Sequence, residues 1–375
     1  MQFRDLARQY QELKPKMDSA MLSVAAGAHY IMGPEVQALE ERLAAYTGVK
    51  HCLTCANGTD ALTLALKAWG IGPGDAVFVP DFTFFASAEV VSLEGATPVF
   101  VDVDARTYNI DTESLEAAVQ AVLAEGRLKP RVVVAVDLFG LPANYPAVRA
   151  IADKYGLLVL EDGAQGFGGS IGSRKACSFG DISTTSFFPA KPLGCYGDGG
   201  AVFTDNDEWA ALIASYRVHG KGADKYDNVR IGLNSRLDTL QAAVLQVKLD
   251  VFDEEVERVN AAAREYSRRL SGKVVTPVIP EGFGSSWAQY TIQLESPEQR
   301  SRVQAALKAA GIPSMVYYPR PMHKQTAFSF IPCQTGEPSP VTTRLSDTVL
   351  SLPMHPYLTL TDIDTVCSVL IASLP

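Results

Sequence analysis

The chain has 375 residues, of which 47% are hydrophobic, and its formal net charge at pH 7 is -9. This length exceeds one ordinary hydrophobic core, so we expect two domains. No dense run of Lys and Arg offsets the acidity, which argues against a nucleic-acid-binding surface. No stretch reaches the roughly 18 apolar residues of a membrane helix, and the N-terminus lacks a signal-peptide core. We therefore expect a cytoplasmic protein that binds neither nucleic acid nor membrane.

The 6 cysteines are too sparse for a disulfide scaffold and fit reduced thiols. Cys52 and Cys55 have the spacing of a metal or redox motif, but the residues around them have the pattern of a strand. Side chains three residues apart on a strand point to opposite faces, so these two thiols cannot bind one ion. None of the 5 histidines pairs at metal-ligand spacing, and no metal is predicted.

Residues 1–50 are predicted to be helical around a loop at 30–34 and to form an arm or lid. From residue 52 onward, short apolar segments alternate with amphipathic segments of helix length. The expected strands are 52–55, 76–80, 98–102, 132–138 and 157–160, and the expected helices are 59–69, 86–93, 112–123 and 145–155. This pattern indicates an α/β fold with a mostly parallel sheet that helices cover on both faces.

A strand at 201–204 and a helix at 209–219 follow, and a polar loop at 230–238 then leads into a long helix. We place the domain boundary near the end of that helix. Residues 1–255 would form the arm and a large α/β domain, and 256–375 a small α+β domain. The elements expected in the small domain are strands at 287–294 and 314–318 and helices at 300–309 and 361–370.

Polar and aromatic residues follow the first two strands of the sheet, where ligands of such sheets gather. Asn57, Gly58 and Thr59 open a helix, so their backbone N–H groups and the Thr59 hydroxyl can hold an anion. An ordinary helix cap is the alternative. Phe84 or Phe85 offers an aromatic face that can stack on a planar ring, although core packing is the commoner use of such a pair.

Asp162 directly follows a buried strand, a costly position unless the carboxylate meets a cation or several donors. A protonated pyridine nitrogen would be such a partner, and an N-cap is the alternative. Lys191 lies between a short apolar strand and a glycine-rich turn, where an amine can meet an aldehyde cofactor. A surface lysine in a polar turn is the other interpretation. Ser186, five residues earlier, can bind a phosphate.

Together these residues match the needs of pyridoxal 5'-phosphate, which are an amine, an acid at the ring nitrogen, a stacking aromatic ring and phosphate donors. The sequence also resembles the DegT-type nucleotide-sugar aminotransferases, which are fold type I pyridoxal phosphate enzymes. Nearly the whole chain carries the resemblance. The matching segments are YIMGPEV at 30–36, ANGTDAL at 56–62, DFTF at 81–84, FVDVD at 100–104, TYNID at 107–111, EDGAQ at 161–165, SFFPAK at 186–191, GLNSRLD at 232–238, YPRPMHKQ at 318–325 and SLPMHP at 351–356.

The resemblance implies a Schiff-base role for Lys191 and a homodimer with shared active sites. It implies that Gly58, Thr59 and Ser186 bind the cofactor phosphate, Phe84 stacks on the ring, Asp162 pairs with its nitrogen, and Gln165 contacts the ring hydroxyl side. The asparagine that matches Asn234 would reach the neighbouring subunit's phosphate. The residues that match positions facing the sugar nucleotide are Tyr317, Tyr318, His323 and Arg236.

Two positions depart from the family pattern. Gly163 stands where alanine is expected, and Phe187 and Phe188 stand where many relatives have a polar residue or histidine. Neither departure removes a reacting group.

The segments at 195–200 and 234–243 look most like the branch that aminates C3 of UDP-2-acetamido-2-deoxy-3-oxo-glucuronate, with glutamate as amino donor, for cell-surface polysaccharide synthesis. Arg236 or Arg320 can pair with the uronate carboxylate, or either can form a structural ion pair. A 4-keto-6-deoxy nucleotide sugar is the alternative substrate.

Two other classes of protein are also considered. The related sugar dehydratases replace the lysine with histidine, and a non-enzymatic regulator would show eroded cofactor residues. Neither feature is found in this sequence.

Overall fold

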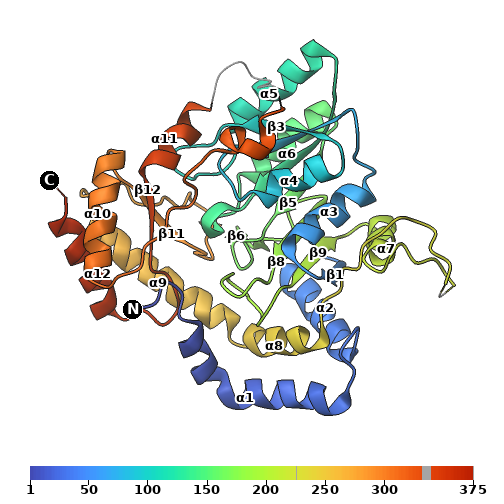
Figure 1. The fold of residues 1–375 in the computed structure, drawn as a ribbon, viewed down its shortest axis with the longest axis horizontal. Helices are drawn as coiled ribbons and strands as arrows, with labels where there is room; N and C mark the ends of the chain where they lie inside the picture. Colours follow the sequence, from blue (N-terminus) through green and yellow to red (C-terminus); the bar gives the residue numbers. More distant parts are fainter. Residues whose placement is uncertain (225, 332–338, 375) are drawn as a thin grey trace.

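The computed structural model describes residues 1–224, 226–331 and 339–374. A seven-stranded sheet forms the centre of the molecule (Figure 1). Its strands, in spatial order, are β1 (His51–Cys55), β9 (Gly200–Thr204), β8 (Ile182–Ser186), β5 (Leu158–Asp162), β4 (Lys129–Val136), β2 (Asp75–Pro80) and β3 (Thr97–Val101). Only β9 runs antiparallel to its neighbours, β1 and β8, so the predicted mostly parallel sheet is confirmed.

Helices cover both faces of the sheet because successive strand residues point to opposite sides. Val132 and Val134 of β4 pack with α3 (Gly58–Ala68), α4 (Ala86–Leu93) and α7 (Asp207–Tyr216). Val133 and Ala135 pack with α5 (Thr112–Glu125) and α6 (Tyr145–Tyr155) on the other face. The same alternation holds on β1, where Cys52 and Cys55 belong to different core clusters. The two thiols therefore do not share a metal site.

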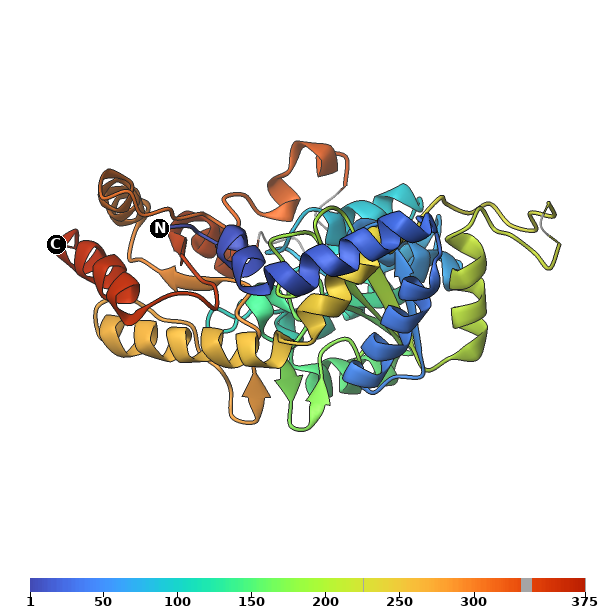
Figure 2. The same ribbon diagram turned by 90° about the horizontal axis from the view of Figure 1, so that it is seen from below.

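The N-terminal arm consists of α1 (Leu6–Gly27) and α2 (Pro34–Thr47). Figure 2 shows α1 lying along α8 (Thr239–Leu249), and apolar residues of α1, α2 and α8 form one cluster over the β1 end of the sheet. The chain before α1 reaches the small domain, because the amide of Met354 donates to the carbonyl of Phe3 at 3.1 Å. The arm thus contacts both parts of the molecule.

The small domain is built on α9 (Phe252–Leu270), the two-stranded sheet of β11 (Tyr290–Gln293) and β12 (Val349–Leu352), and three further helices. These are α10 (Pro297–Ala309), α11 (Pro340–Thr348) and α12 (Leu360–Ala372). Phe252 at the start of α9 packs in the core of the large domain, whereas Val259 and the following turns pack in the core of the small domain. The boundary at 255 therefore falls inside one continuous helix, and the division 1–255 and 256–375 remains a proposal.

Most predicted elements are present with shifted ends, but two predictions for the second half of the chain were wrong. The helix expected to begin near residue 237 ends at Leu249, and a separate helix, α9, follows it. The strand expected at 314–318 is not formed, because only Met315 makes a ladder contact, to Ser351. A three-stranded sheet of β10 (Phe283–Gly284), β6 (Ser170–Ile171) and β7 (Arg174–Lys175) was not foreseen.

A hairpin at 217–238 projects from the large domain (Figure 2). Isolated bridges join Val218 to Asn234 and Lys221 to Asn228 along its two arms. The side chain of Ile231 on this hairpin is 90% exposed, which is unusual for an isoleucine. No helix in the described part of the chain has the length and apolarity needed to cross a membrane.

Candidate active site

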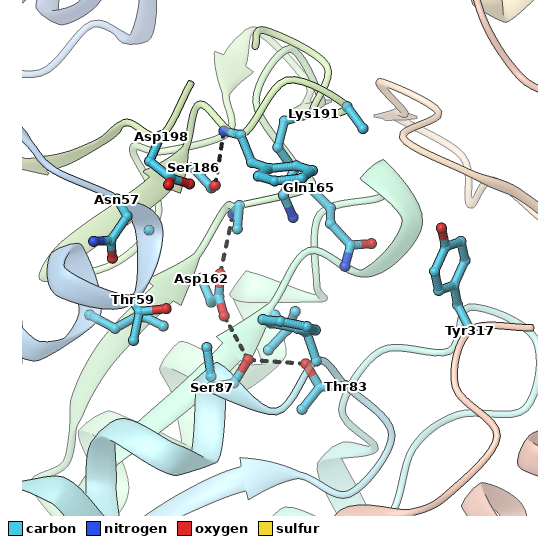
Figure 3. A pocket seen from close by; sticks show the side chains of 18 of the residues that line it. Asn57, Thr59, Thr83, Ser87, Asp162, Gln165, Ser186, Lys191, Asp198 and Tyr317 are labelled. Atoms are coloured by element: carbon cyan, nitrogen blue, oxygen red, sulfur yellow. Dashed lines mark hydrogen bonds between the residues drawn. The ribbon is translucent and has the colours of Figure 1, made fainter. Parts of the chain in front are cut away.

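A cavity of about 680 Å³ opens at the carboxyl edge of the central sheet (Figure 3). Its walls come from the residues that follow β1, β2, β4, β5 and β8, as expected for a parallel sheet. Tyr317, from the segment after α10, closes the opposite side, and Tyr318 also lines the cavity. The cavity brings together most of the predicted site residues, namely Asn57, Gly58, Thr59, Phe84, Asp162, Gln165, Ser186, Lys191, Tyr317 and Tyr318.

Asp162 is the last residue of β5 and is buried, with 4% of its surface exposed. Its carboxylate accepts hydrogen bonds from the Ser87 hydroxyl at 2.7 Å and from the Ala164 amide at 3.2 Å. The Ser87 hydroxyl also lies 3.1 Å from that of Thr83. Burial raises the pKa of Asp162, and the two hydrogen bonds and the Lys191 charge oppose this effect. Both hydrogen-bond donors are neutral, so the carboxylate can still take a cation as partner.

Lys191 is half-buried and lies on the cavity wall. Burial lowers the pKa of its amine to about 8, with Asp162 acting in the opposite direction and Arg4 adding to the decrease. The turn after it is tight, because a Cβ on Gly194 would lie 2.5 Å from the carbonyl oxygen of Pro189. An amine with this pKa is partly uncharged near neutral pH, as a nucleophile or base must be.

The start of α3 lies directly against Ser186. A Cβ on Gly58 would be 2.7 Å from the Ser186 Cβ, and a Cβ on Gly200 would be 2.5 Å from the Asn57 carbonyl oxygen. Asn57 caps α3 by accepting a hydrogen bond from the Asp60 amide at 2.8 Å. Asn57 can therefore cap α3 while the other N–H groups at the start of the helix bind an anion. The Thr59 side chain and the Ser186 hydroxyl face the same end of the cavity, at the positive end of the helix dipole (Figure 3).

The two phenylalanines after β2 have different roles. Phe84 is 54% exposed and lines the cavity, whereas Phe85 packs against Phe328 with their ring centroids 5.0 Å apart. The alternative of core packing is thus wrong for Phe84 and correct for Phe85. Gln165 accepts a hydrogen bond from the Phe139 amide at 2.8 Å and donates one to the Tyr318 hydroxyl at 3.0 Å. Its side chain is held in place beside the cavity.

Four predicted site residues do not line this cavity. The His323 ring nitrogen Nδ1 lies 2.5 Å from a carboxylate oxygen of Asp81, which is fully buried. Arg320 is exposed to solvent. Asn234 and Arg236 are on the hairpin, where the Arg236 guanidinium donates to the Asn234 side-chain oxygen at 2.6 Å. Arg236 lines a second hollow together with His219, Lys221 and Arg230.

Several residues of the cavity wall were not predicted to be site residues, although Phe188 is one of the departures from the family pattern. These are Thr83, Ser87, Phe188, Asp198 and Gln289. Thr83 lies in the turn before α4 and Ser87 in its first turn, and their hydroxyl oxygens are 3.1 Å apart. The side-chain oxygen of Gln289 is buried without a hydrogen-bond partner, and no motif marks this position. Among the described residues there is no group of three or more His, Cys, Asp or Glu that could hold a metal ion.

Comparisons with known proteins agree with this arrangement. Residues 11–371 match the model of the DegT/DnrJ/EryC1/StrS aminotransferase family. The chain belongs to this family. It is 45% identical over 371 residues to UDP-2-acetamido-2-deoxy-3-oxo-D-glucuronate aminotransferase of Pseudomonas aeruginosa, with 99% of each chain covered.

A second relative is the UDP-N-acetyl-3-dehydro-alpha-D-glucosamine 3-aminotransferase of Acidithiobacillus ferrooxidans. It is 41% identical, with 94% of this chain and 92% of the relative covered. Among solved structures, a family member from Brucella abortus has 50% identity and a TM-score of 0.95, with 99% of this chain and 98% of that chain covered. The chain is therefore an aminotransferase of fold type I, and pyridoxal phosphate is its cofactor.

The cavity of this DegT-family aminotransferase fits that cofactor. A protonated ring nitrogen would give the buried Asp162 carboxylate the cationic partner that its neutral donors do not supply. The absence of a side chain at Gly58 leaves backbone N–H groups accessible for a phosphate beside Ser186. Phe84 presents an exposed aromatic face, and Lys191 provides an amine of lowered pKa.

The two departures from the family pattern have physical explanations. A Cβ on Gly163 would lie 2.7 Å from the Cys177 sulfur and 3.0 Å from the Thr184 carbonyl oxygen. Cys177 thus fills the space that an alanine methyl group would need. Phe187 is fully buried in the core, whereas Phe188 is 52% exposed and lines the cavity. The first departure is a packing exchange, and the second adds an aromatic side chain to the cavity wall.

Proposed function

We propose that this enzyme transfers an amino group from glutamate to a nucleotide-linked keto sugar, with C3 of UDP-2-acetamido-2-deoxy-3-oxo-glucuronate as the best candidate acceptor. The observation that carries the proposal is the 45% identity, over 99% of both chains, to the P. aeruginosa aminotransferase named for that substrate. The reaction would take place in the cytoplasm, and its product would serve the synthesis of a cell-surface polysaccharide. A 4-keto-6-deoxy nucleotide sugar is the second candidate, because a GDP-perosamine synthase of Caulobacter vibrioides, whose product is a 4-amino-6-deoxy sugar, is 34% identical.

When bound, pyridoxal phosphate supplies an aldehyde that links to amines and a ring that accepts electrons from the adjacent carbon. Lys191 would hold the cofactor covalently and be released when the amino donor takes its place. The free Lys191 amine, with a pKa of about 8, would then carry the proton that leaves the donor Cα. Asp162 would keep the proton on the ring nitrogen, and so favour electron flow toward the ring.

The charges on the cavity wall also favour a homodimer with shared sites. Among the described residues that line the cavity, Lys191 is the only Lys or Arg, whereas Asp60, Asp162 and Asp198 are acidic. A cofactor phosphate, a diphosphate and a uronate carboxylate need more positive charge than this. The hairpin hollow contains His219, Lys221, Arg230 and Arg236. A second copy would supply this charge by placing its Asn234 and Arg236 in the cavity.

The remaining sugar-binding roles are assigned by position. Tyr317 and Tyr318 line the cavity opposite Lys191 and would contact the sugar. Arg320 is exposed and would reach the sugar nucleotide only through the mouth of the cavity. His323, held by Asp81, would act by fixing the segment that carries the two tyrosines. The exposed apolar residues of the hairpin, such as Ile231, would be covered in the proposed dimer interface.

The function is tested with the pyridoxamine form of the enzyme and a panel of 3-keto and 4-keto UDP and dTDP sugars. Return of the aldehyde absorbance with the 3-keto uronate, faster than with any 4-keto sugar, would support the proposal. Faster return with a 4-keto sugar would favour the second candidate. No return with any sugar would refute the whole assignment.

Borohydride reduction of the resting enzyme tests the role of Lys191. The reduced cofactor should be found on the peptide that contains Lys191, and Lys191→Ala should abolish the labelling. A stable linkage in the Lys191→Ala variant would show that another residue holds the cofactor.

A further inference from the structure

Two basic side chains donate hydrogen bonds to the backbone of the turn that carries Lys191. The guanidinium of Arg4 lies 2.9 Å from the carbonyl oxygen of Lys191 and 3.3 Å from that of Pro192. The amine of Lys248 lies 2.6 Å from the carbonyl oxygen of Gly194. Arg4 precedes α1 and Lys248 lies on α8, so two distant segments hold the same turn.

Both cations are shielded from water, Lys248 almost completely and Arg4 in part. Lys248 is 2% exposed and stands over the Tyr196 ring, 4.6 Å from its centroid. Burial lowers the pKa of Lys248 to about 8 and that of Arg4 to about 10. Placing one cation in such a position is costly, and placing two beside one turn is more so. An apolar residue of similar size would be cheaper at either position, so the hydrogen bonds to the turn have to compensate.

A buried carboxylate acts on both cations. The charge of Glu255, in the first turn of α9, partly offsets the decrease that burial causes in the pKa values of Arg4 and Lys248. Its carboxylate accepts hydrogen bonds from the Gln9 amide at 3.1 and 2.9 Å and from the Tyr357 hydroxyl at 2.5 Å. Gln9 is on α1, and Tyr357 follows β12 in the small domain. The hydrogen bonds of Glu255 therefore join the arm to the small domain, and its charge acts on the two cations that hold the Lys191 turn.

The residue before Arg4 links the same segment to the sugar side of the cavity. The Phe3 ring meets the Tyr317 ring edge-on, with the centroids 6.3 Å apart. Tyr317 lines the cavity opposite Lys191. Two adjacent residues of the N-terminal segment thus contact the two sides of the cavity. Arg4 binds the turn that carries Lys191, and Phe3 packs against Tyr317 on the opposite wall.

We propose that Arg4 and Lys248 are positioning residues that clamp the Lys191 turn, with Glu255 as their common anion. The clamp fixes where the Lys191 amine stands relative to Asp162 and the cofactor. It also transmits the placement of the small domain to the lysine through Glu255 and Tyr357. The inference rests on Lys191 as the residue that links to the cofactor.

Arg4 and Lys248 should act differently on the charge of Lys191. The charged groups that shift the Lys191 pKa are Asp162, which raises it, and Arg4, which lowers it. The other titratable side chains on the cavity wall are Asp60, Asp198, Tyr317 and Tyr318. Because a nearby cation disfavours protonation of an amine, removal of the Arg4 charge should raise the pKa of Lys191. Lys248 should affect position alone.

The test is a pH titration of the visible absorbance of the cofactor-loaded, full-length enzyme, which follows protonation of the nitrogen that links Lys191 to the cofactor. A nearby cation disfavours protonation of this nitrogen as it does that of the free amine. In Arg4→Met the midpoint should move upward by roughly 0.5 pH unit or more. Arg8→Met is the matched control, since Arg8 is 61% exposed on α1 and pairs only with Glu12 among the ion pairs of the described residues. Its midpoint should equal that of the wild type. An unshifted midpoint in Arg4→Met would overturn the charge role of Arg4.

Two further variants separate position from charge. Arg4→Lys keeps the charge, but its shorter side chain does not reach the position from which one guanidinium nitrogen donates to both carbonyl groups, so its midpoint should stay near the wild-type value while kcat falls. Lys248→Met should lower kcat about tenfold with little change in the KM of the keto sugar. Wild-type kcat in both variants would overturn the clamp. The absorbance titration needs no sugar, so its outcome is independent of which substrate the enzyme uses.

Discussion

The cavity around Lys191 and the hairpin at 217–238 are built in opposite ways. The cavity is formed by the ends of buried strands and carries three acidic side chains and one amine. The hairpin projects into solvent and carries Lys221, Arg230 and Arg236, together with apolar side chains such as the 90% exposed Ile231. The hairpin has the positive charge that the cavity lacks, and the cavity has the reactive lysine that the hairpin lacks. We infer that one functional site requires both regions, taken from two copies of the chain.

The two regions are also connected within one chain. Ser235 of the hairpin accepts a hydrogen bond from the amide of Ala56 at 3.1 Å. Ala56 directly precedes Asn57, which caps α3. The hairpin therefore lies next to the cavity of its own chain. The charged residues of the hairpin do not line that cavity.

The largest effect is expected for a change at the buried end of the cavity. Asp162→Asn removes the charge that would hold the proton on the ring nitrogen but keeps the shape of the side chain. We expect kcat to fall by about 10²- to 10³-fold. The first half-reaction with glutamate, followed by stopped-flow absorbance, measures it. Ser87→Ala, which removes only a donor to Asp162, is the control and should cost much less. Equal losses in both variants would contradict the charge role of Asp162.

The next effect concerns the hairpin. Arg236→Ala should raise the KM of the keto uronate by about 10- to 100-fold, the cost of a charge-assisted hydrogen bond. The half-reaction with glutamate should change less, because glutamate lacks the sugar and the uronate carboxylate that Arg236 is proposed to bind. Arg320→Ala is the matched control at the other candidate arginine. A larger effect in Arg320→Ala than in Arg236→Ala would transfer the carboxylate-binding role to Arg320.

A smaller effect is expected in the pH dependence of Lys191. Burial lowers the pKa of its amine to about 8, from an ordinary value of 10.5, so the uncharged form increases as pH rises through 8. Acetylation of Lys191 in the cofactor-free enzyme should therefore rise with a midpoint near pH 8. Competitive labelling followed by mass spectrometry gives the midpoint. A midpoint near the ordinary lysine value would show that the amine is not shielded from water.

The smallest effect tests the packing below the cavity. Gly163→Ala should lower the free energy of unfolding by about 1–3 kcal/mol, because its methyl group would meet the Cys177 sulfur at 2.7 Å. Adding Cys177→Ala should recover part of the loss by making space. Denaturant unfolding of the two single variants and the double variant measures the coupling. Additive losses would contradict the exchange of volume between the two positions.

The sequence predicted the sheet, and the cavity contains the candidate residues chosen at strand ends. Val132 to Val136 are apolar on both faces, as in a strand covered on both sides, and Asp162 and Lys191 stand out as charges after apolar segments. The sequence did not predict α9, whose many charged residues hide the stripe formed by Val259, Ala263 and Tyr266. Arg4 could not be selected either, because its contact with Lys191 joins residues 187 positions apart.

Some residues that match the family pattern do not line the cavity, because the fold places them elsewhere. His323 and Asn234 match the family pattern as clearly as Lys191, yet His323 binds Asp81 and Asn234 is on the hairpin. A motif records that a residue matters, but the fold decides whether it acts directly, through a neighbour or in another subunit. Gln289 shows the converse, since it lines the cavity without belonging to any motif.

The most direct test of the shared site is complementation between two inactive chains. One chain carries Lys191→Ala and the other carries Asn234→Ala with Arg236→Ala. A mixed dimer would contain one site with an intact Lys191 and an intact hairpin, so random mixing should restore about a quarter of wild-type activity. If the hairpin acts only within its own chain, every site in the mixture is defective, and absence of recovered activity in a verified mixed dimer would contradict the account.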